Sequence, residues 1–169
     1  MPDGLSQTEA KSVLKAVSIF ADIKDNEEAL SLLTGMMKNQ KFPAGHTLIE
    51  QGTNGDEFYV LCDGNVSIFK KTPEEDRYKV VVLSHQSHPS FGEGGLMEGE
   101  IRSATIVCDT PVECLVLARK DFESFCRQSP QFALPVLKKI AQSLMGRLNQ
   151  TSNDLMLLHK ALMDEIRNS

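Results

Sequence analysis

The sequence predicts an α+β fold, in which helices at both ends of the chain flank an antiparallel β sandwich or barrel. Apolar residues recur at helical spacing before about residue 40 and again after Asp121. Glycines divide the stretch between these two regions into short segments that are typical of strands. The chain has 169 residues, which suffices for one domain with a sizeable core and an additional element.

The N-terminal region predicts a tail and two short helices. Residues 1–7 are expected to be a frayed tail, and Val13 and Val17 lie at helical spacing within an amphipathic helix over 8–21. Asn26 is a good N-cap residue, and the two glutamates that follow it favour the first turn of a second helix.

The central region predicts strands separated by turns. Glycines at Gly45, Gly52, Gly55 and Gly64 divide segments that are rich in β-branched and aromatic residues. Short strands with turn signals at close intervals are typical of a sandwich or barrel. The charged stretch 72–76 is expected to form a hairpin tip. The expected strands include residues 47–49, 57–61, 66–69, 79–83, 104–107 and 112–117.

The last third of the chain predicts helices. Pro135 is compatible with a first turn, so we expect one helix to end near Pro130 and a longer one to start there. Leu148, Leu155 and Leu162 follow at heptad spacing, and such a seam predicts pairing with the same helix of a second subunit. The alternative is packing against the β domain, but the helix outruns the surface that a small sandwich can cover.

One glycine-rich segment carries the candidate site. Phe91-Gly92-Glu93-Gly94-Gly95-Leu96 is followed shortly by Arg102, between two predicted strands. Glycines let backbone N–H groups approach phosphate oxygens closely, and the Arg102 guanidinium can hold two oxygens at once. An ionised Glu93 only accepts hydrogen bonds, so it suits a sugar hydroxyl. The segment therefore predicts a pocket for a phosphate next to a sugar.

This segment resembles the phosphate-binding cassette of the cyclic nucleotide-binding domain family. The family pattern is Phe-Gly-Glu, two small or apolar residues, Leu, a variable stretch, and then Arg before small residues. The resemblance implies that Glu93 holds the ribose 2′-hydroxyl, that Arg102 holds the cyclic phosphate, and that Ser103 adds a hydroxyl contact to the phosphate. Gly94 departs from the pattern, because it replaces an aliphatic residue and removes a packing contact. The glycines whose backbone would line the turn are Gly92, Gly94 and Gly95.

A second pattern, from Gly45 to Gly64, matches the strand-and-turn signature of the same family, and the resemblance covers about residues 20–155. It implies a cyclic nucleotide-binding β-roll, which is a jelly-roll-like antiparallel sandwich, with short N-terminal helices and a long C-terminal dimerisation helix. The expected organisation is an N-terminal tail and helix at 1–25, the β-roll with its flanking helices at 26–130, and signalling and dimerisation helices at 131–169.

Two hydroxyl residues of the long helix bear on the choice of ligand. The run that ends in Thr151 and Ser152 looks like the corresponding run of bacterial activators in the family, in which such residues contact adenine, one of them from the opposite subunit. Hydroxyls donate and accept, so they can meet a purine edge. We therefore expect cyclic AMP, although Ser and Thr are also ordinary on exposed helix faces. Cyclic GMP stays open, because a hydroxyl at the position of Ser103 can reach the guanine amine in some relatives.

Composition argues against several other classes. A net charge of −5 and a pI near 5.4 do not favour nucleic-acid binding, and we expect no DNA-binding domain in this chain. The apolar runs are too short to span a membrane. Four cysteines without a C-x-x-C pair favour buried thiols in a reduced, cytoplasmic protein.

Catalysis and metal binding are not expected. The sequence has no nucleophile elbow, His-Glu-x-x-His motif or Walker A loop. His85, His88 and Glu93 could imitate the metal site of a cupin-like enzyme, but the His-x-x-His spacing fits an alternating strand poorly. Glu98 and Glu100 are interpreted as a solvated loop tip.

The expected function is a regulatory domain that binds a cyclic nucleotide and transmits binding to its C-terminal helix, as an allosteric sensor and homodimer. It is either a stand-alone sensor or the sensory part of a longer signalling protein, with an output domain or partner protein after Ser169. The alternative is a β-roll that serves only for dimerisation and has a degenerate pocket.

Overall fold

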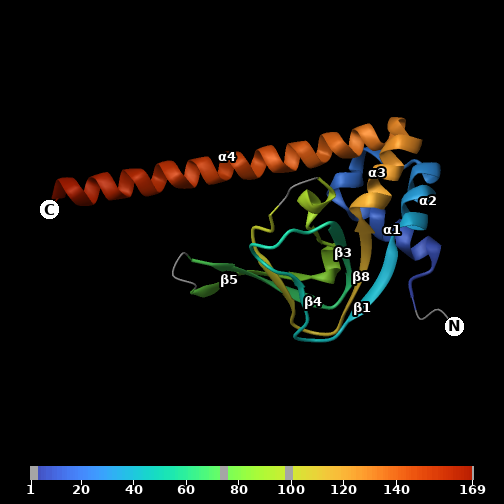
Figure 1. Ribbon diagram of the computed structural model, residues 1–169, viewed down its shortest axis with the longest axis horizontal. Helices are drawn as coiled ribbons and strands as arrows, with labels where there is room; N and C mark the ends of the chain where they lie inside the picture. Colours follow the sequence, from blue (N-terminus) through green and yellow to red (C-terminus); the bar gives the residue numbers. More distant parts are fainter. Residues whose placement is uncertain (1–3, 73–75, 98–100, 169) are drawn as a thin grey trace.

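The computed structural model describes residues 4–72, 76–97 and 101–168 of the chain. Figure 1 shows a β-roll with short helices packed at one end and one long C-terminal helix that runs over the roll and projects beyond it. This arrangement confirms the predicted α+β fold with a long C-terminal helix.

The bounds of the elements are as follows. The N-terminal elements are α1 (Gln7–Ala16), the 3₁₀ helix η1 (Ser18–Ile23) and α2 (Glu27–Met36). The strands are β1 (Lys38–Phe42), β2 (Thr47–Ile49), β3 (Glu57–Asp63), β4 (Asn65–Lys71), β5 (Arg77–Ser84), β6 (Ser90–Phe91), β7 (Thr105–Cys108) and β8 (Val112–Ala118). The 3₁₀ helices η2 (His85–Ser87) and η3 (Glu93–Leu96) lie on either side of β6, and the C-terminal helices are α3 (Arg119–Gln128) and α4 (Pro130–Asn168).

Side-chain caps begin the N-terminal helices. The Ser6 hydroxyl accepts from the backbone N–H of Glu9, and the Glu9 carboxylate accepts from the N–H of Ser6, which completes a capping box at α1. Asn26 caps α2 as predicted, by accepting from the N–H of Ala29 at 2.9 Å. The single helix expected over 8–21 is divided, because Val17 adopts an extended conformation between α1 and η1.

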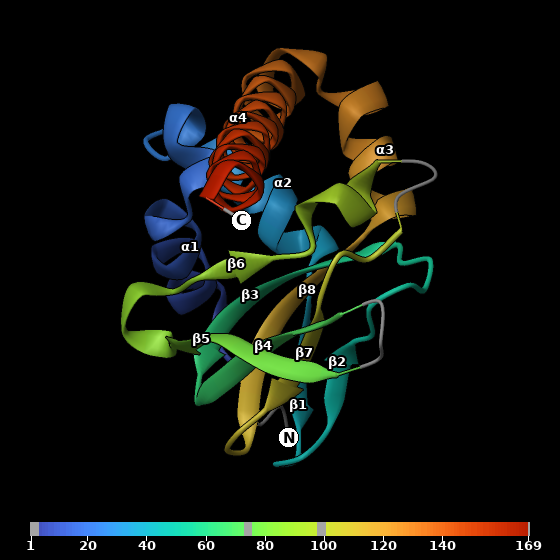
Figure 2. The same cartoon turned by 90° about the vertical axis from the view of Figure 1, so that its left-hand side faces the viewer.

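Two four-stranded antiparallel sheets form the roll, with strand orders β1-β8-β3-β6 and β2-β7-β4-β5. Figure 2 looks along α4 and shows the sheets below it, with η3 and β6 on the side that faces the helix. In the second sheet Ile68 of β4 pairs with Ile106 of β7 and with Val81 of β5. The expected hairpin tip at 72–76 joins β4 to β5 but falls largely outside the described residues.

Two apolar clusters hold these layers together. One joins the N-terminal helices, the roll and α3 and contains four fully buried aromatic rings, among them Phe20 and Phe58, which meet edge to face at 6.1 Å between ring centroids. The other lies between the two sheets and includes Leu61, Val66 and Ile106. The second cluster forms the wall on which the candidate site rests.

Helix α4 changes environment along its length. Ala133, Val136 and Ile140 are buried against the rest of the protein, whereas every described residue from Leu144 onward is exposed. The carbonyl of Ser129 accepts from the N–H groups of Phe132 and Ala133, and α3 and α4 are separate near Pro130 as predicted. Pro135, which was expected in a first turn, lies inside α4. Within the described parts of the chain, no helix is both long enough and apolar enough to cross a membrane.

Candidate functional site

A cavity of about 310 Å³ opens between the second sheet, residues 91–93, residues 102–104 and α4. This volume is within the usual range of small-molecule sites. Four of the predicted site residues line the cavity, namely Gly92, Glu93, Arg102 and Ser103. The other lining residues are Ile49, Ile68, Lys70, Phe91, Ala104, Ile106 and Arg147.

The glycines of the turn make room for the arginine. Gly92 has a φ of +79°, a conformation that glycine adopts without strain. A Cβ atom on Gly95 would lie 2.6 Å from Nη2 of Arg102 and 2.8 Å from the carbonyl oxygen of Glu57. Gly94 and Gly95 are buried within η3 and do not line the cavity. Gly95 therefore contributes space for the Arg102 side chain, and Gly92 contributes both such space and part of the cavity wall.

Arg102 is buried, with 6% of its surface exposed, and its guanidinium is held in place by carbonyl oxygens. Nη1 donates to the carbonyl of Gly92 at 3.1 Å, and Nη2 donates to that of Glu57 at 2.6 Å. Its backbone is fixed as well, because its N–H donates to Thr53 and its carbonyl accepts from Gly52. The arginine is thus oriented before any anion arrives, which lowers the cost of binding one.

Glu93 is also buried, at 5% exposure, and its carboxylate contacts α4. Oε1 accepts from the Ser143 hydroxyl at 3.2 Å and forms an ion pair with Arg147. The residue predicted to hold the ribose is therefore the residue that joins the glycine-rich turn to the long helix. Sequence reasoning missed Ser143 and Arg147. Arg147 lies one helical turn before Thr151, so helical spacing places it on the face of that predicted site residue but does not indicate its contact with Glu93.

Arg119 is a second arginine that sequence reasoning missed. From the first residue of α3, its Nε donates to the carbonyl of Gly95 at 3.0 Å and its Nη2 donates to that of Gly55 at 2.7 Å. Its own N–H donates to the carbonyl of Asp56 at 2.7 Å. Because a guanidinium is planar and carries several donors, one side chain ties the turn, the loop before β3 and α3 together.

Thr151 and Ser152 do not line the cavity of the single chain, and both are exposed. Thr151 follows Ser143 and Arg147 at intervals of four residues, so it lies on the face of α4 that carries them. Ser152 points about 100° further around the helix axis. Their contact with a ligand stays a prediction.

The remaining candidates for chemistry have ordinary structural partners. Nδ1 of His85 lies 3.2 Å from the carbonyl oxygen of Gly64, and Nδ1 of His88 lies 3.3 Å from that of Leu61. Glu98 and Glu100 lie outside the described residues. Among the residues that the structure describes, no group of three or more His, Cys, Asp and Glu side chains could hold a metal ion.

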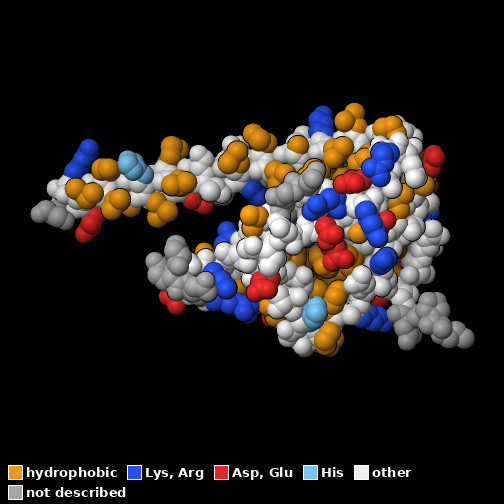
Figure 3. Space-filling view, in the orientation of Figure 1, with side chains coloured by type: hydrophobic (Ala, Val, Ile, Leu, Met, Phe, Trp, Pro, Cys, Tyr) orange, Lys and Arg blue, Asp and Glu red, His pale blue; other side chains and the backbone are white. Residues whose placement is uncertain are grey.

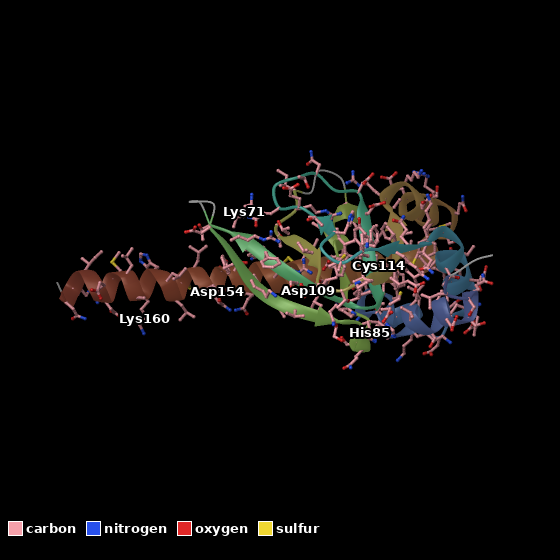
Figure 4. All side chains as sticks on the ribbon, turned by 90° about the horizontal axis from the view of Figure 1, so that it is seen from below. Lys71, His85, Asp109, Cys114, Asp154 and Lys160 are labelled. Carbon is pink, nitrogen blue, oxygen red and sulfur yellow. The ribbon has the colours of Figure 1, made fainter. Side chains whose placement is uncertain are left out.

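The four cysteines are free, and burial suppresses their ionisation. Burial raises the pKa of the Cys62 thiol to about 11 and that of Cys114, inside the roll in Figure 4, to about 12. The pKa values of Cys108 and Cys126 are raised for the same reason. Thiols that stay protonated are poor nucleophiles, which fits the prediction of structural cysteines.

Comparison with known families decides what this site belongs to. Residues 39–129, more than half of the chain, match the family model described as "Cyclic nucleotide-binding domain". The chain belongs to the cyclic nucleotide-binding domain family. The matched region includes both the turn with Glu93 and the Arg102 that it surrounds.

Curated relatives of this cyclic nucleotide-binding domain include a protein kinase and a regulatory subunit of a protein kinase. It is 33% identical over 110 residues to a cGMP-dependent protein kinase of Caenorhabditis briggsae, covering 64% of this chain and 14% of that protein. It is 33% identical over 113 residues to a cAMP-dependent protein kinase regulatory subunit of Aspergillus fumigatus, covering 67% of this chain and 26% of that one. The chain therefore corresponds to a minor part of each of these two relatives.

A solved structure shows the same fold. The catabolite activator protein of Thermus thermophilus aligns with a TM-score of 0.72 and 26% identity, over 83% of this chain and 62% of that chain. The likeness confirms the cyclic nucleotide-binding β-roll.

Proposed function

We propose that this domain is a regulatory sensor of cyclic AMP that passes ligand binding to α4 in a homodimer. The observation that carries the proposal is that Arg102 and Glu93, both buried, line one cavity together with the turn glycine Gly92, whose carbonyl oxygen accepts from Arg102. A guanidinium suits the cyclic phosphate, and a carboxylate suits the ribose 2′-hydroxyl. Binding, and not a reaction, is the function that this pair of groups supports.

The signal would pass through Glu93. A ribose hydroxyl that donates to the Glu93 carboxylate must share it with Ser143 and Arg147, which already bind there. Any loss of those contacts releases α4 from the glycine-rich turn. A ligand shifts such an equilibrium only by its different affinities for the two arrangements, so competition for one carboxylate is a sufficient physical coupling.

Dimerisation is supported by the surface of α4. Leu148, Leu155 and Leu162, which we call the leucine seam, are 61%, 62% and 57% exposed in the single chain. Figure 3 shows hydrophobic side chains recurring along the projecting helix. Leucines at heptad spacing on two parallel helices bury one another in a coiled coil. A second copy of the chain is therefore the proposed occupant of this seam.

The choice of cyclic AMP depends on this dimer. Thr151 lies on the helix face that carries Arg147 and contacts the roll of its own subunit, whereas Ser152 is turned away from that face. Pairing through the leucine seam would direct Ser152 toward the roll of the second subunit. The two hydroxyls could then meet the amine and ring nitrogens of adenine from both chains.

The location and output of the sensor are part of the same proposal. Four free, protonated thiols are typical of a reducing compartment, which favours the cytoplasm. Because the chain corresponds to a part of its relatives, a partner protein or an output domain beyond Ser169 would receive the signal.

Calorimetric titration of the purified chain with cyclic AMP and cyclic GMP tests the proposal. Arg102→Ala should weaken binding by about 2–5 kcal/mol, because the phosphate loses its buried partner. Arg77→Ala is the matched control, since Arg77 stacks on Phe69 and does not line the cavity. In Glu93→Ala, 2′-deoxy cyclic AMP should bind as well as cyclic AMP. Normal affinity in a folded Arg102→Ala protein would refute the pocket.

The competing function is a dimerisation module that does not bind nucleotides. It is favoured by the ion pair of Arg147 with Glu93, which occupies the carboxylate that a ribose would need. A nucleotide-free, folded dimer that gives no binding heat with either cyclic nucleotide would establish this alternative.

A further inference from the structure

Besides Arg102 and Glu93, which are proposed to bind phosphate and ribose, the cavity is lined by residues of β4 and β7. We take this part of the cavity as the place of the base. Ile68 and Ile106 pair across these strands and form an apolar floor with Ala104, which suits the face of a flat base. Lys70 lies two residues beyond Ile68 on β4, so it is on the same face of the sheet, and it lines the same cavity. The polar side chain at the base end of the pocket is therefore a cation.

Lys70 adds a charge that the phosphate does not require. Three cations and one anion line the cavity: Lys70, Arg102 and Arg147 against Glu93. A cyclic mononucleotide carries one negative charge, which Arg102 is placed to meet, and Arg147 is paired with Glu93. Among the described residues the Lys70 ammonium has no ion-pair partner, so it is available to a ligand.

Two basic residues of β5, Arg77 and Lys79, are directed toward Phe69. The Arg77 guanidinium lies 3.9 Å from the centroid of the Phe69 ring, and the Lys79 ammonium lies 5.5 Å from it. Because neighbouring residues of a strand point to opposite faces, Phe69 holds these two cations on the face opposite to Lys70. Arg77, Lys79 and the adjacent Lys71 do not line the cavity. Lys70 is thus placed for recognition, not as one member of a diffuse basic patch.

A lysine distinguishes the two purines by its donors. The ammonium only donates hydrogen bonds. Guanine presents two adjacent acceptors, N7 and O6, whereas adenine presents N7 next to an amine donor. The Lys70 ammonium can therefore donate to both N7 and O6 of guanine. On adenine it faces the amine, which is also a donor and cannot accept from it.

We propose that cyclic GMP is a second ligand of this pocket and that Lys70 of β4 recognises the edge of its guanine base. The hydroxyls of α4 are the proposed determinants for the first ligand, cyclic AMP. The inference rests on the proposed function, because it uses the same phosphate and ribose groups. Ser103, which lines the cavity, could add a contact to the 2-amine of guanine. Lys70 of β4 would then recognise cyclic GMP, and the hydroxyls of α4 would recognise cyclic AMP.

The test is a set of titrations with cyclic AMP, cyclic GMP and cyclic IMP, which has the 6-oxo group but lacks the 2-amine. In Lys70→Met the affinity for cyclic GMP and for cyclic IMP should fall about tenfold, while that for cyclic AMP stays within about twofold. Lys79→Met removes the same charge from the opposite face and should change none of the three. Lys70→Arg should keep cyclic GMP binding, because arginine also donates to N7 and O6.

The outcomes separate the inference from the function on which it rests. Retained cyclic AMP binding shows that Lys70→Met is folded, so a selective loss of cyclic GMP and cyclic IMP supports the inference. Equal losses for all three ligands, or no loss for any, would overturn it and leave the sensor standing. No binding of either natural nucleotide to the unmodified chain would overturn the sensor itself.

Discussion

Arg147 of α4 forms an ion pair with Glu93 of the glycine-rich turn, although the two residues are 54 positions apart in the sequence. The Glu93 side chain is 6% exposed, whereas that of Arg147 is 58% exposed. One partner is thus fixed inside the site, and the other reaches it from a helix that faces solvent. The pair links the exposed part of α4 to the glycine-rich turn at the cavity, beyond the residues Ala133, Val136 and Ile140 that bury the start of the helix.

Removing the charge of Arg147 should loosen this attachment and free Glu93. We expect Arg147→Gln to lower the free energy of unfolding by at most about 1 kcal/mol, since the exposed partner is screened by water. The affinity for a cyclic nucleotide should rise severalfold, because the ribose hydroxyl then meets less competition. Urea unfolding and calorimetric titration measure the two effects. Lys160→Gln, on the projecting part of α4 (Figure 4), is the control and should change neither. A weaker affinity in Arg147→Gln would instead mean that Arg147 contacts the ligand.

The space at Gly95 should be as important as the charges around it. Gly95→Ala would bring a methyl group to 2.6 Å from Nη2 of Arg102, so the guanidinium must move. We expect a loss of about 1–3 kcal/mol in stability and a clear loss of nucleotide affinity. Gly146→Ala provides the contrast, because no heavy atom lies within 4 Å of its added Cβ and alanine should stabilise the helix by about 1 kcal/mol. Thermal unfolding with and without ligand distinguishes the two, and wild-type affinity in Gly95→Ala would contradict the steric role.

Local signals in the sequence predicted the fold and half of the site, for identifiable physical reasons. Asn26 begins α2 and Gly92 takes a positive φ because caps and tight turns are decided by the residue itself. Glu93 and Arg102 were found because their chemistry lies in one short segment. The division of the first helix at Val17 was not predicted, because the apolar spacing continues across this residue although its backbone is extended.

Contacts between segments that are far apart in the chain could not be predicted from the sequence. Arg119 and Arg147 approach the turn from two helices that follow the β-roll, and no periodicity indicates which arginine of a helix meets which carbonyl or carboxylate. Lys70 was overlooked for the same reason, because strand alternation alone does not say which face of β4 a cavity opens on. Thr151 and Ser152 differ again, since their predicted role depends on a second copy of the chain.

Buried thiols should make the protein less stable in alkali. Burial raises the pKa of Cys114 from its ordinary value of 9.0 to about 12, so the folded chain keeps a proton that the unfolded chain releases. This contribution is complete below about pH 9 and is lost as the pH rises from there toward 12. Urea unfolding at a series of pH values should show the decline, and Cys114→Ala should flatten it. An equally steep decline in the variant would assign the effect to other groups.

The leucine seam should control both assembly and ligand choice. Leu155→Lys places a charge in the middle of the seam, so we expect a monomer by sedimentation equilibrium. Leu157 is the matched control, because it is equally exposed, at 67% against 62%, but points away from the seam, and Leu157→Lys should stay dimeric. If Ser152 acts across the dimer, the Leu155→Lys monomer should still bind the phosphate through Arg102. Its affinity for cyclic AMP should fall toward its affinity for cyclic IMP, because the contact of Ser152 with adenine is lost. A Leu155→Lys protein that remains dimeric would exclude this face of α4 as the interface, and a monomer with unchanged preference for cyclic AMP would confine base recognition to the β-roll.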